Sequence, residues 1–304
     1  MANPINSLDF QSKLTGELDK AIVAKSVTGF MTDNVMRQKF VGARNVLIPD
    51  LEMQGLGAYD RDTGFARGSI TVDQKTYTLS KDRARTFSID REDMDEMGIA
   101  SLAGQVMGEF VRTKVVPEVD AYALSTLCAT ATTQEHLLSL GKDETINANC
   151  YKLITTAVNN INNITGYEED VVVFCNPTVY NALMNTAELS RTITTSDFKK
   201  GEITTQVKRI NNAVIIPVPD ARMKTEYTYL TNGNGGFAPT ETAKSIGILA
   251  MPKKAGSLIK KTEKIRIFNP DQNIDMDAYK FDYRLYYDVF VKNSAKNTIY
   301  AYVY

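Results

Sequence analysis

The stretch YKFDYRLYYDVFV, Tyr279–Val291, has an apolar or aromatic residue at every odd position. Because successive side chains of a β-strand point to opposite faces, this alternation predicts a long strand with one fully apolar face. Most even positions carry charge instead, namely Lys280, Asp282, Arg284, Asp288 and Lys292. A nucleic-acid platform would pair exposed aromatic rings with a basic groove, whereas these charges are balanced. We therefore interpret the aromatic face as part of a sheet core.

The chain on either side of this strand predicts further sheet. After it, a polar turn leads into a final strand, Thr298–Val303. Before it, helical and extended patterns alternate, which is typical of an α/β unit. Its helices are Cys150–Ile164 and Thr178–Thr186, and its strands are Val171–Cys175, Ala213–Pro217 and Ser245–Met251. Asn176 and Pro177 are the expected cap and first-turn proline of the second helix.

A long helix is predicted ahead of this unit. Apolar residues recur at helical spacing over Ile99–Leu127, on both sides of Pro117. Proline lacks an N–H group and clashes with the preceding turn, at a cost of ~3 kcal/mol. We therefore expect one helix that is kinked or broken near Val116. A separate amphipathic helix is predicted over Phe10–Ile22, where apolar residues recur every four positions.

Residues 45–90 predict a long two-stranded excursion rather than a compact unit. The chain goes out through Val46–Asp50 and returns as Ser69–Leu79 and Arg85–Ile89, with glycines and charged residues at the tip. Along the returning strand the apolar residues change from even to odd positions, so we expect a β-bulge near residues 73–75. A two-stranded ribbon is barely stable alone in water. The excursion therefore needs a partner surface.

Composition excludes several classes of protein. Of the 304 residues, 43% are hydrophobic and 23% are charged, as in ordinary globular proteins. A formal net charge of -1 excludes the strongly basic balance of a dedicated nucleic-acid binder. We expect neither a membrane span nor a secretory signal, because no apolar run approaches ~18 residues and the N-terminus lacks a basic leader. Cys128, Cys150 and Cys175 have no paired spacing and are expected to be buried, reduced thiols.

Few residues offer chemistry. His136 is the only histidine, which excludes most hydrolase triads and two-histidine metal sites. It follows a helical pattern, and we interpret it as a capping or exposed residue. Asp271–Asp277 alternates oxygen ligands as a calcium loop does, but Met276 stands where glycine is required, and Asp93–Gly98 has a methionine at a ligand position. We expect no metal ion, no cofactor and no enzymatic activity.

Three motifs carry a resemblance to a known family. They are EFVRTKVVPEVDAY (Glu109–Tyr122), Asn176–Pro177, and Lys264–Phe268 running into Tyr283–Asp288. With the order of elements, they make the sequence similar to the tailed-bacteriophage major capsid protein, whose coat protein fold is shared with encapsulin shells. The resemblance implies an α+β fold. It has an N-terminal arm, an extended β-ribbon loop, a peripheral domain with a long spine helix and an inserted axial α/β domain.

The resemblance also implies boundaries and partners. The N-terminal arm would be residues 1–44, the extended loop 45–90, the peripheral domain 91–133 and 253–304, and the axial domain 134–252. Chains would assemble into pentamers and hexamers of an icosahedral head shell that encloses viral double-stranded DNA. Scaffolding and portal proteins are the implied partners, with packaged DNA contacted only non-specifically and no membrane. The chain would assemble in the bacterial host cytoplasm and reside in the virion.

Each extended loop would lie over a neighbouring subunit. We expect Arg61, Asp62 and Arg67 at its tip to form intersubunit ion pairs that set the register, with a solvated tip as the alternative. Some family members join subunits by an isopeptide bond between a loop lysine and a peripheral-domain asparagine. This loop has no lysine before Lys75. We therefore expect a non-covalent shell, and keep Lys75 with Asn273 as the candidate pair for a bond.

Three other functions stay open. An encapsulin-like nanocompartment shell would enclose cargo enzymes rather than a genome. An enzyme could use His136 or the acidic loop 269–277. A calcium-dependent surface protein would be sensitive to chelators.

Overall fold

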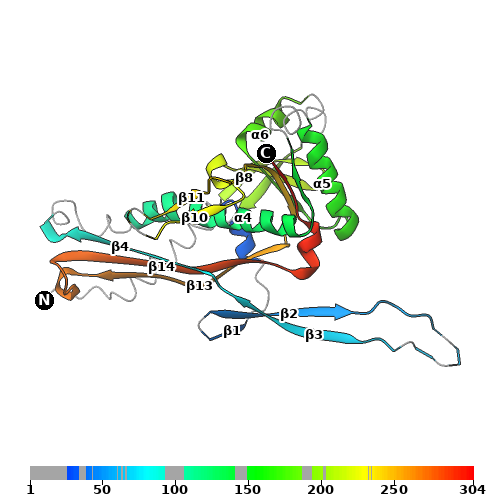
Figure 1. Ribbon diagram of the computed structural model, residues 1–304, viewed down its shortest axis with the longest axis horizontal. Helices are drawn as coiled ribbons and strands as arrows, with labels where there is room; N and C mark the ends of the chain where they lie inside the picture. Colours follow the sequence, from blue (N-terminus) through cyan, green and yellow to red (C-terminus); the bar gives the residue numbers. More distant parts are fainter. Residues whose placement is uncertain are drawn as a thin grey trace.

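The computed structural model combines a long three-stranded sheet, a seven-stranded sheet and a projecting ribbon (Figure 1). It describes residues 26–33, 39–42, 44–59, 61–62, 64–65, 67–92, 106–140, 149–186, 194–200, 203–231, 233 and 235–304. The helix expected over Phe10–Ile22 and the acidic stretch Asp93–Gly98 lie outside the described residues. The mixed α+β class expected from the sequence is confirmed.

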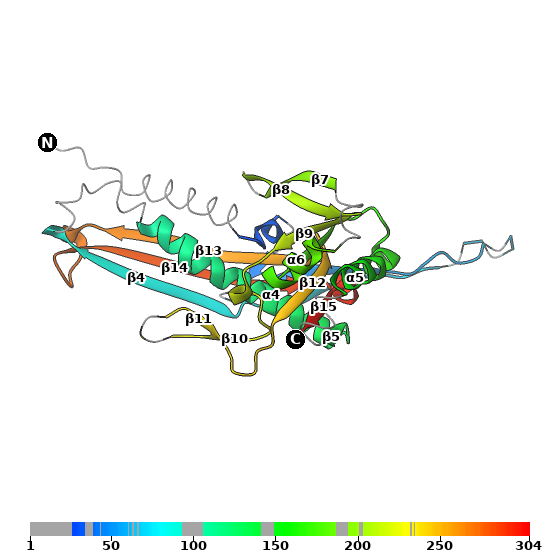
Figure 2. The same ribbon diagram turned by 90° about the horizontal axis from the view of Figure 1, so that it is seen from above.

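The three-stranded antiparallel sheet runs along the long axis of the molecule (Figures 1 and 2). In spatial order its strands are β13 (Gly256–Phe268), β14 (Ala278–Val291) and β4 (Lys81–Asp90). The 3-10 turn η6 (Pro270–Gln272) lies between β13 and β14. The alternation over Tyr279–Val291 thus predicted β14, and Phe281 and Tyr287 on its aromatic face are buried as expected.

One helix lies along this sheet and spans residues 106–133. Its first turn leads through the π-helical segment η2 (Val111–Val115) into α4 (Val116–Thr133). The N–H of Val116 bonds to the carbonyl of Val111, five residues back. Because Pro117 has no N–H and its ring would clash with a carbonyl of the preceding turn, the widened turn accommodates the proline. The irregularity expected near Val116 is confirmed, and the helix continues through it.

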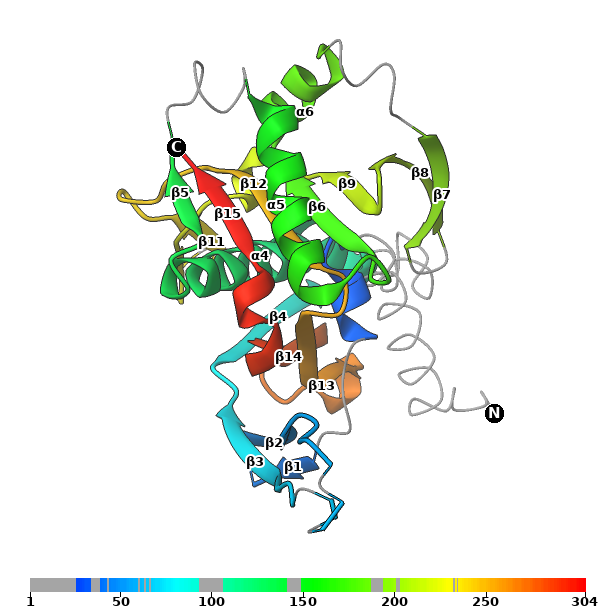
Figure 3. The same cartoon turned by 90° about the vertical axis from the view of Figure 1, so that its right-hand side faces the viewer.

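The seven-stranded sheet is covered by helices on both faces (Figure 3). Helices α5 (Cys150–Thr165) and α6 (Pro177–Met184) pack on one face, and α4 packs on the other. The strands, in spatial order, are β5 (Leu137–Ser139), β15 (Tyr300–Val303), β12 (Ile246–Pro252), β6 (Val171–Cys175), β9 (Ala213–Pro217), β8 (Ile203–Ile210) and β7 (Thr194–Lys200).

This sheet confirms most of the predicted α/β unit. Asn176 caps α6, its side chain accepting a hydrogen bond of 2.9 Å from the N–H of Val179. The final strand, expected with the peripheral segment 253–304, differs in its partners. It forms as β15 but pairs with β12 and β5, so the chain returns to the seven-stranded sheet after β14. Local alternation predicts that a strand exists, whereas its neighbours depend on long-range packing.

Short elements complete the described chain. They are η1 (Gly29–Thr32), β1 (Lys39–Val41), η5 (Asp220–Arg222), β10 (Tyr227–Tyr229), β11 (Phe237–Pro239) and η7 (Asn293–Thr298). β10 and β11 form a two-stranded hairpin. Its connection lies against β4, where Arg83 and Arg85 donate hydrogen bonds to the carbonyls of Leu230, Gly233 and Gly236.

The ribbon consists of β2 (Asn45–Met53) and β3 (Ile70–Thr78), with β1 beside β2. Its register runs without a shift from Asn45 opposite Thr78 to Met53 opposite Ile70, so the expected bulge near residues 73–75 is wrong. The expectation assumed that the apolar residues of the returning strand face inward, whereas the side chain of Ile70 is 67% exposed. The two-stranded pairing expected over 45–90 is also too long. β4 leaves the ribbon and pairs with β14 instead.

The three cysteines confirm the prediction made for them. Cys128, Cys150 and Cys175 are free and buried. Burial raises the pKa of the Cys128 thiol to about 12, so this thiol stays protonated at neutral pH. Among the described helices, none is long and apolar enough to cross a membrane.

Candidate assembly surfaces

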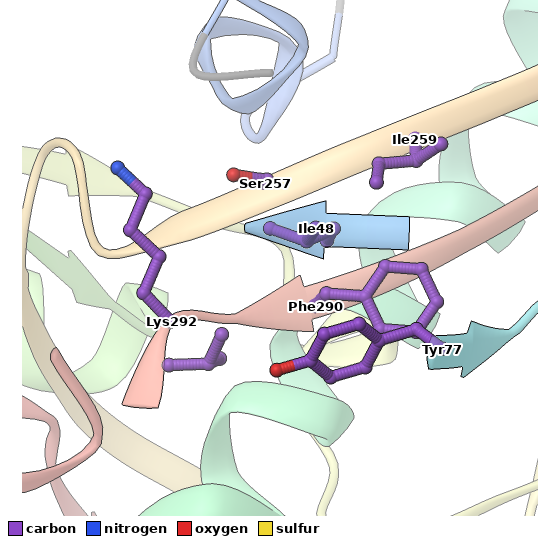
Figure 4. Close-up of a pocket in the computed structure, with 7 residues that line it drawn as sticks. Ile48, Tyr77, Ser257, Ile259, Phe290 and Lys292 are labelled. Atoms are coloured by element: carbon purple, nitrogen blue, oxygen red, sulfur yellow. The ribbon is translucent and has the colours of Figure 1, made fainter. Parts of the chain in front are cut away.

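The root of the ribbon is held by a small hydrophobic cluster of its own. Val46 and Leu79 from the ribbon pack with Ile259 of β13 and Tyr286 of β14. In Figure 4, Tyr77 of β3 faces Phe290 of β14, and their ring centroids are 4.9 Å apart. The cavity beside them has a volume of about 20 Å³, which is room for a water molecule and not for a side chain. The root of the ribbon is therefore closely packed against the long sheet.

A buried carboxylate also holds the ribbon root in place by hydrogen bonds. Asp288 of β14 accepts from the N–H of Ser80 at 2.7 Å and from the phenol of Tyr122 at 2.6 Å. The phenol of Tyr286 donates to the carbonyl of Leu79 at 3.2 Å. Burial, and then the bond to Asp288, raise the pKa of Tyr122 to about 12, so the phenol remains a donor. Helix α4, β14 and the ribbon thus meet at one polar group.

Lys81, the residue after Ser80, lies in an aromatic environment. Its Nζ is 3.8 Å from the ring centroid of Tyr229 and 4.9 Å from that of Tyr122. Burial lowers the pKa of Lys81, an effect that Asp288 partly opposes. A cation above tyrosine rings is attracted by their negative faces. The contact ties the start of β4 to α4 and the β10–β11 hairpin.

The register of the ribbon pairs two apolar residues at its outer end. Met53 lies directly opposite Ile70. Directly opposite residues of an antiparallel pair point to the same face of the ribbon. Both side chains are exposed, at 65% and 67%, so the outer end of the ribbon presents an exposed apolar pair.

The ribbon tip, residues 54–69, carries exposed apolar side chains. Leu56 is fully exposed, and Phe65 is 87% exposed. Tyr59 lies edge-on to Phe65, with ring centroids 5.2 Å apart. No pattern in the sequence marks these residues, because they are scattered between glycines and charges and follow neither a helical nor a strand period. Their presence together at one tip is the signal that the structure adds, since exposed apolar groups mark interaction sites.

The charged residues expected at the tip do lie there. Arg61, Asp62 and Arg67 are all exposed. Within the described part of the chain, Arg61 and Arg67 have no hydrogen-bond or ion-pair partner. Whether they form intersubunit pairs stays a prediction.

The candidate pair for a covalent bond is not brought together within one chain. Lys75 lies on β3 opposite Ile48, whereas Asn273 lies in the turn between β13 and β14. Figures 1 and 2 place the ribbon and this turn at opposite ends of the molecule. The side-chain amide of Asn273 donates to the carbonyl of Ala278 at 2.9 Å. A bond between Lys75 and Asn273 would therefore have to join two chains.

The turn 269–277 is a second exposed end. Ile274 is 100% exposed and Met276 is 59% exposed. The alternating aspartates here, considered above as calcium ligands, are held by cations. Arg91 is 2.9 Å from Asp271 and 3.4 Å from Asp277, and Lys280 is 3.5 Å from Asp275. No group of three or more candidate metal-ligating residues occurs among the described residues.

A buried aspartate connects three distant segments. Asp120 of α4 is fully buried and accepts hydrogen bonds from Ser26 and from the backbone and hydroxyl of Thr28. Its second oxygen accepts from Arg222 of η5 at 3.1 Å. The carboxylate thus fixes residues 26–28 and η5 on the long helix. No sequence motif signals this role, since an aspartate within a helical pattern is ordinarily exposed.

His136 occupies no catalytic arrangement among the described residues. It follows the end of α4, as expected, with its N–H bonded to the carbonyl of Ala131 at 2.9 Å. Its ring stacks on Tyr300, with centroids 4.3 Å apart and planes 8° apart. The ring is half-buried rather than exposed, and it joins the helix end to β15.

A groove of about 330 Å³ lies between α4, β4, β14 and the connection between β10 and β11. Phe87, Phe110 and Leu285 contribute to its apolar lining, and Lys114 and Arg85 to its cationic rim. Arg83 at the same rim forms an ion pair of 2.7 Å with Glu118. The groove is a second apolar surface on the body of the chain.

Comparison with solved structures identifies the fold. The capsid of the cyanophage P-SCSP1u matches with a TM-score of 0.59 and 13% identity, over 88% of this chain and 85% of that chain. The mature capsid of bacteriophage PhiM1 matches with a TM-score of 0.55 and 11% identity, over 86% and 82%. A virus-like particle from Pyrococcus furiosus matches with a TM-score of 0.54 and 11% identity, over 98% and 99%.

These likenesses show that the chain has the fold of phage capsid proteins and of this virus-like particle. The fold implied by the sequence resemblance is thereby confirmed. No protein-family model and no curated protein matches the sequence. At such low identity the likeness establishes the fold, and function has to be argued from the surfaces.

Proposed function

We propose that this chain is a major capsid protein that self-assembles into pentamers and hexamers of an icosahedral shell enclosing viral double-stranded DNA. The observation that carries the proposal is the ribbon. A hydrophobic cluster anchors it at its root, Met53 and Ile70 form an exposed apolar pair further out, and Leu56, Tyr59 and Phe65 are exposed at its tip. An isolated two-stranded ribbon with exposed apolar groups is unstable unless another surface covers it. The capsid fold supplies the context in which that surface is another copy.

The elements fit the roles that the fold implies. In this proposal residues 1–44 are the N-terminal arm, and the extended loop ends where β4 begins. The long sheet and α4 form the peripheral domain. The seven-stranded sheet, including β15, forms the axial domain around the capsomer axes. A scaffolding protein, a portal protein and non-specifically bound DNA are the proposed partners, in the bacterial cytoplasm during assembly and in the virion afterwards.

The shell is proposed to be non-enzymatic and non-covalent. Chemistry at His136 has little support, because its ring is engaged in stacking on Tyr300. An isopeptide bond between Lys75 and a neighbour's Asn273 would appear as a mass loss of one ammonia per bond and as covalent oligomers under denaturing conditions. We expect neither.

A protein nanocompartment is the second candidate. The observation that favours it is coverage, since the Pyrococcus furiosus particle matches over 98% of this chain and 99% of its own. The contents of the particle separate the two functions. Packaged double-stranded DNA supports the viral shell, and a co-purifying cargo enzyme supports the compartment.

The direct test compares the wild-type chain with a variant whose ribbon tip, residues 54–69, is replaced by a short Gly-Ser turn. Each is purified with and without a coexpressed scaffolding protein, sized by chromatography with light scattering, and viewed by negative-stain electron microscopy. We expect closed particles or capsomer rings for the wild type and soluble single chains for the variant. A wild-type monomer under both conditions would refute the proposal. Exchange of the exposed Tyr167, outside the ribbon, for serine is the matched control.

A further inference from the structure

We infer that the groove between α4, β4, β14 and the β10–β11 connection binds an acidic peptide. The occupant is a linear segment of a partner protein, with an aromatic side chain next to carboxylates. The groove lies within a single chain, so the inference goes beyond the proposed function and does not depend on shell formation. Its volume of about 330 Å³ is more than twice the ~150 Å³ of a cavity that holds benzene. The groove therefore has room for one or two side chains of a peptide.

One wall of the groove is a row of aromatic rings. Phe87 of β4 lies edge-on to Phe110, with centroids 4.8 Å apart and planes at 71°. Phe110 in turn lies edge-on to Tyr283 of β14, at 5.7 Å and 76°. Phe87 and Phe110 are half-buried, so their rings still offer surface to an occupant. Because aromatic rings prefer edge-on or offset neighbours, a further ring extends this row favourably.

The charged residues of the lining leave an excess of positive charge. They are Arg83, Arg85, Lys114 and Glu118, and the ion pair of 2.7 Å between Arg83 and Glu118 neutralises two of them. Arg85 and Lys114 are exposed, and neither has a carboxylate partner among the described residues. Arg85 donates a hydrogen bond of 3.0 Å to the carbonyl of Gly233, which leaves its charge uncompensated. Two such cations beside an apolar wall select an occupant with negative charge.

Charged residues outside the lining do not reverse this sign. They occur as groups of opposite charge that lie close to each other, so they add no net charge. They are Arg112 with Glu109 at 2.5 Å, Lys260 with Glu263 at 3.1 Å, and Lys81 with Asp288 in its surroundings.

The lining also includes a hydrogen-bond donor that is not satisfied. Tyr287 is buried, and its phenol has no hydrogen-bond partner among the described residues. Burial raises the pKa of Tyr287 well above its ordinary value of 10.0, so the O–H stays a donor. A buried donor without an acceptor destabilises a protein. Carboxylates and peptide carbonyls are acceptors, so an acidic peptide brings the kind of group that this site lacks.

The groove is a poorer match for a nucleic-acid strand. Single strands are held by aromatic platforms together with a basic groove that follows the phosphates. Here only Arg85 and Lys114 are free of carboxylate partners among the described lining residues, and the carboxylate of Glu118 lies in the same lining. An aromatic side chain with one or two acidic neighbours needs no longer basic surface than this.

Fluorescence anisotropy with a labelled peptide tests binding to the full-length chain. The probe is a pentapeptide with one phenylalanine between two pairs of glutamates. We expect saturable binding that weakens as salt rises, because exposed ion pairs are screened. A peptide with serine in place of phenylalanine should bind about tenfold more weakly, since the buried ring is the anchor. A peptide with glutamines in place of the glutamates should bind about two- to fivefold more weakly for each ion pair lost.

Charge reversal in the lining tests the position of the site. Lys114→Glu should weaken binding of the acidic peptide by about tenfold, because an attractive contact becomes a repulsive one. Lys152→Glu is the matched control, since it makes the same change at an exposed position of α5, which packs on the other face of the seven-stranded sheet. The control should bind the peptide as the wild type does. Equal binding by the wild type and Lys114→Glu would overturn the inference.

Photochemical cross-linking locates the bound peptide independently of any variant. The peptide carries benzoylphenylalanine in place of phenylalanine, and its excited ketone inserts into a neighbouring C–H bond. Mass spectrometry then identifies the attached residues. We expect attachment within residues 83–87, 110–119 and 230–236. Attachment confined to the ribbon or to the turn 269–277 would overturn the inference.

Three further outcomes would assign the groove to another occupant and so overturn the inference. Equal affinity for 3-phenylpropionate would indicate a small free acid. Displacement of the peptide by an equal concentration of a short oligothymidylate would indicate a nucleic-acid strand. Binding to single chains but not to assembled particles would indicate that another copy covers the groove.

Particle formation is scored separately, which distinguishes this inference from the proposed function. Peptide binding by a wild-type chain that forms no particles would support the groove and refute only the shell. Particles from a chain that binds no peptide in any state would refute only the groove.

Discussion

The phenol of Tyr122 donates a hydrogen bond of 2.6 Å to Asp288, at the point where the ribbon leaves the body of the chain. The other oxygen of Asp288 accepts the N–H of Ser80, which lies between β3 and β4. The long helix, the long sheet and the ribbon root therefore share one buried carboxylate. This arrangement fixes the direction of the ribbon by contacts within a single chain, before any neighbour is present.

Removing this carboxylate should loosen the ribbon root. We expect Asp288→Ala to lower the free energy of unfolding by about 1–3 kcal/mol, because the Ser80 N–H and the Tyr122 phenol lose their acceptor. Hydrogen exchange at Ser80 should accelerate. Asp282→Ala is the matched control on the same strand, since Asp282 accepts a bond from Thr86 at an exposed position. Equal effects of the two substitutions would contradict this role.

The junction at Asp120 should matter more for stability. Asp120→Ala leaves Ser26, Thr28 and Arg222 without their shared acceptor inside the protein. We expect a loss of about 3–5 kcal/mol in urea unfolding, the range for breaking one partner of a buried ion pair. Limited proteolysis should also reach residues 26–33. Asp220→Ala, which removes an exposed partner of Lys224, should change stability little. Resistance of the segment to protease in the Asp120 variant would exclude the anchoring role.

Stability should fall in alkaline solution. The pKa values of Cys128 and Tyr122 are both raised to about 12, mainly by burial, from ordinary values of 9.0 and 10.0. These two groups contribute fully to the free energy of unfolding below their unfolded-state pKa values. The contribution is lost as pH rises toward about 12, because the same groups ionise first in the unfolded chain. Lys81, whose pKa is lowered, acts in the opposite direction as pH approaches the ordinary lysine pKa of 10.5.

Thermal unfolding measured from about pH 8 to about pH 11 checks this expectation. The midpoint should decline over that interval, and less steeply in Tyr122→Phe than in the wild type. A midpoint that does not change with pH would contradict the burial of these groups.

A close approach of helix and sheet predicts a further effect. A Cβ atom added at Gly256 would lie 2.4 Å from Cε of Met31 and 3.5 Å from Cδ2 of Leu127. Met31 is fully buried, so its side chain has little space to move. We expect Gly256→Ala to cost about 1–3 kcal/mol by overpacking. Gly55→Ala, where nothing lies within 4 Å, is the control, and chemical denaturation compares the two. Indistinguishable midpoints would show that Met31 can move without cost.

How much of the fold could be predicted from the sequence depends on whether each feature is set by neighbouring residues or by residues far away in the chain. The alternation over Tyr279–Val291 and the cap at Asn176 are local, and both identified their elements. The effect of Pro117 is also local, and the irregularity appeared beside it. The partners of β15 and β4 depend on contacts with residues far away in the chain. Neither pairing leaves a local pattern, so the ribbon was expected to be longer than it is.

The candidate surfaces divide in the same way. Arg61, Asp62 and Arg67 were placed at the tip because they lie between two strand patterns. The aromatic pair of Tyr59 and Phe65 was not expected, because exposure of isolated apolar residues has no periodic signature. The junction at Asp120 was likewise invisible, since its donors come from segments about ninety to a hundred residues away in sequence.

The central claim is that copies of this chain form a closed shell in which each ribbon is buried against a neighbour. Cryo-electron microscopy of purified particles tests it most directly. We predict an icosahedral map in which residues 45–78 of every chain lie on an adjacent chain, with Phe65 out of contact with solvent. A map of closed particles with ribbons that project freely into solvent, or a sample that contains only single chains, would contradict the account.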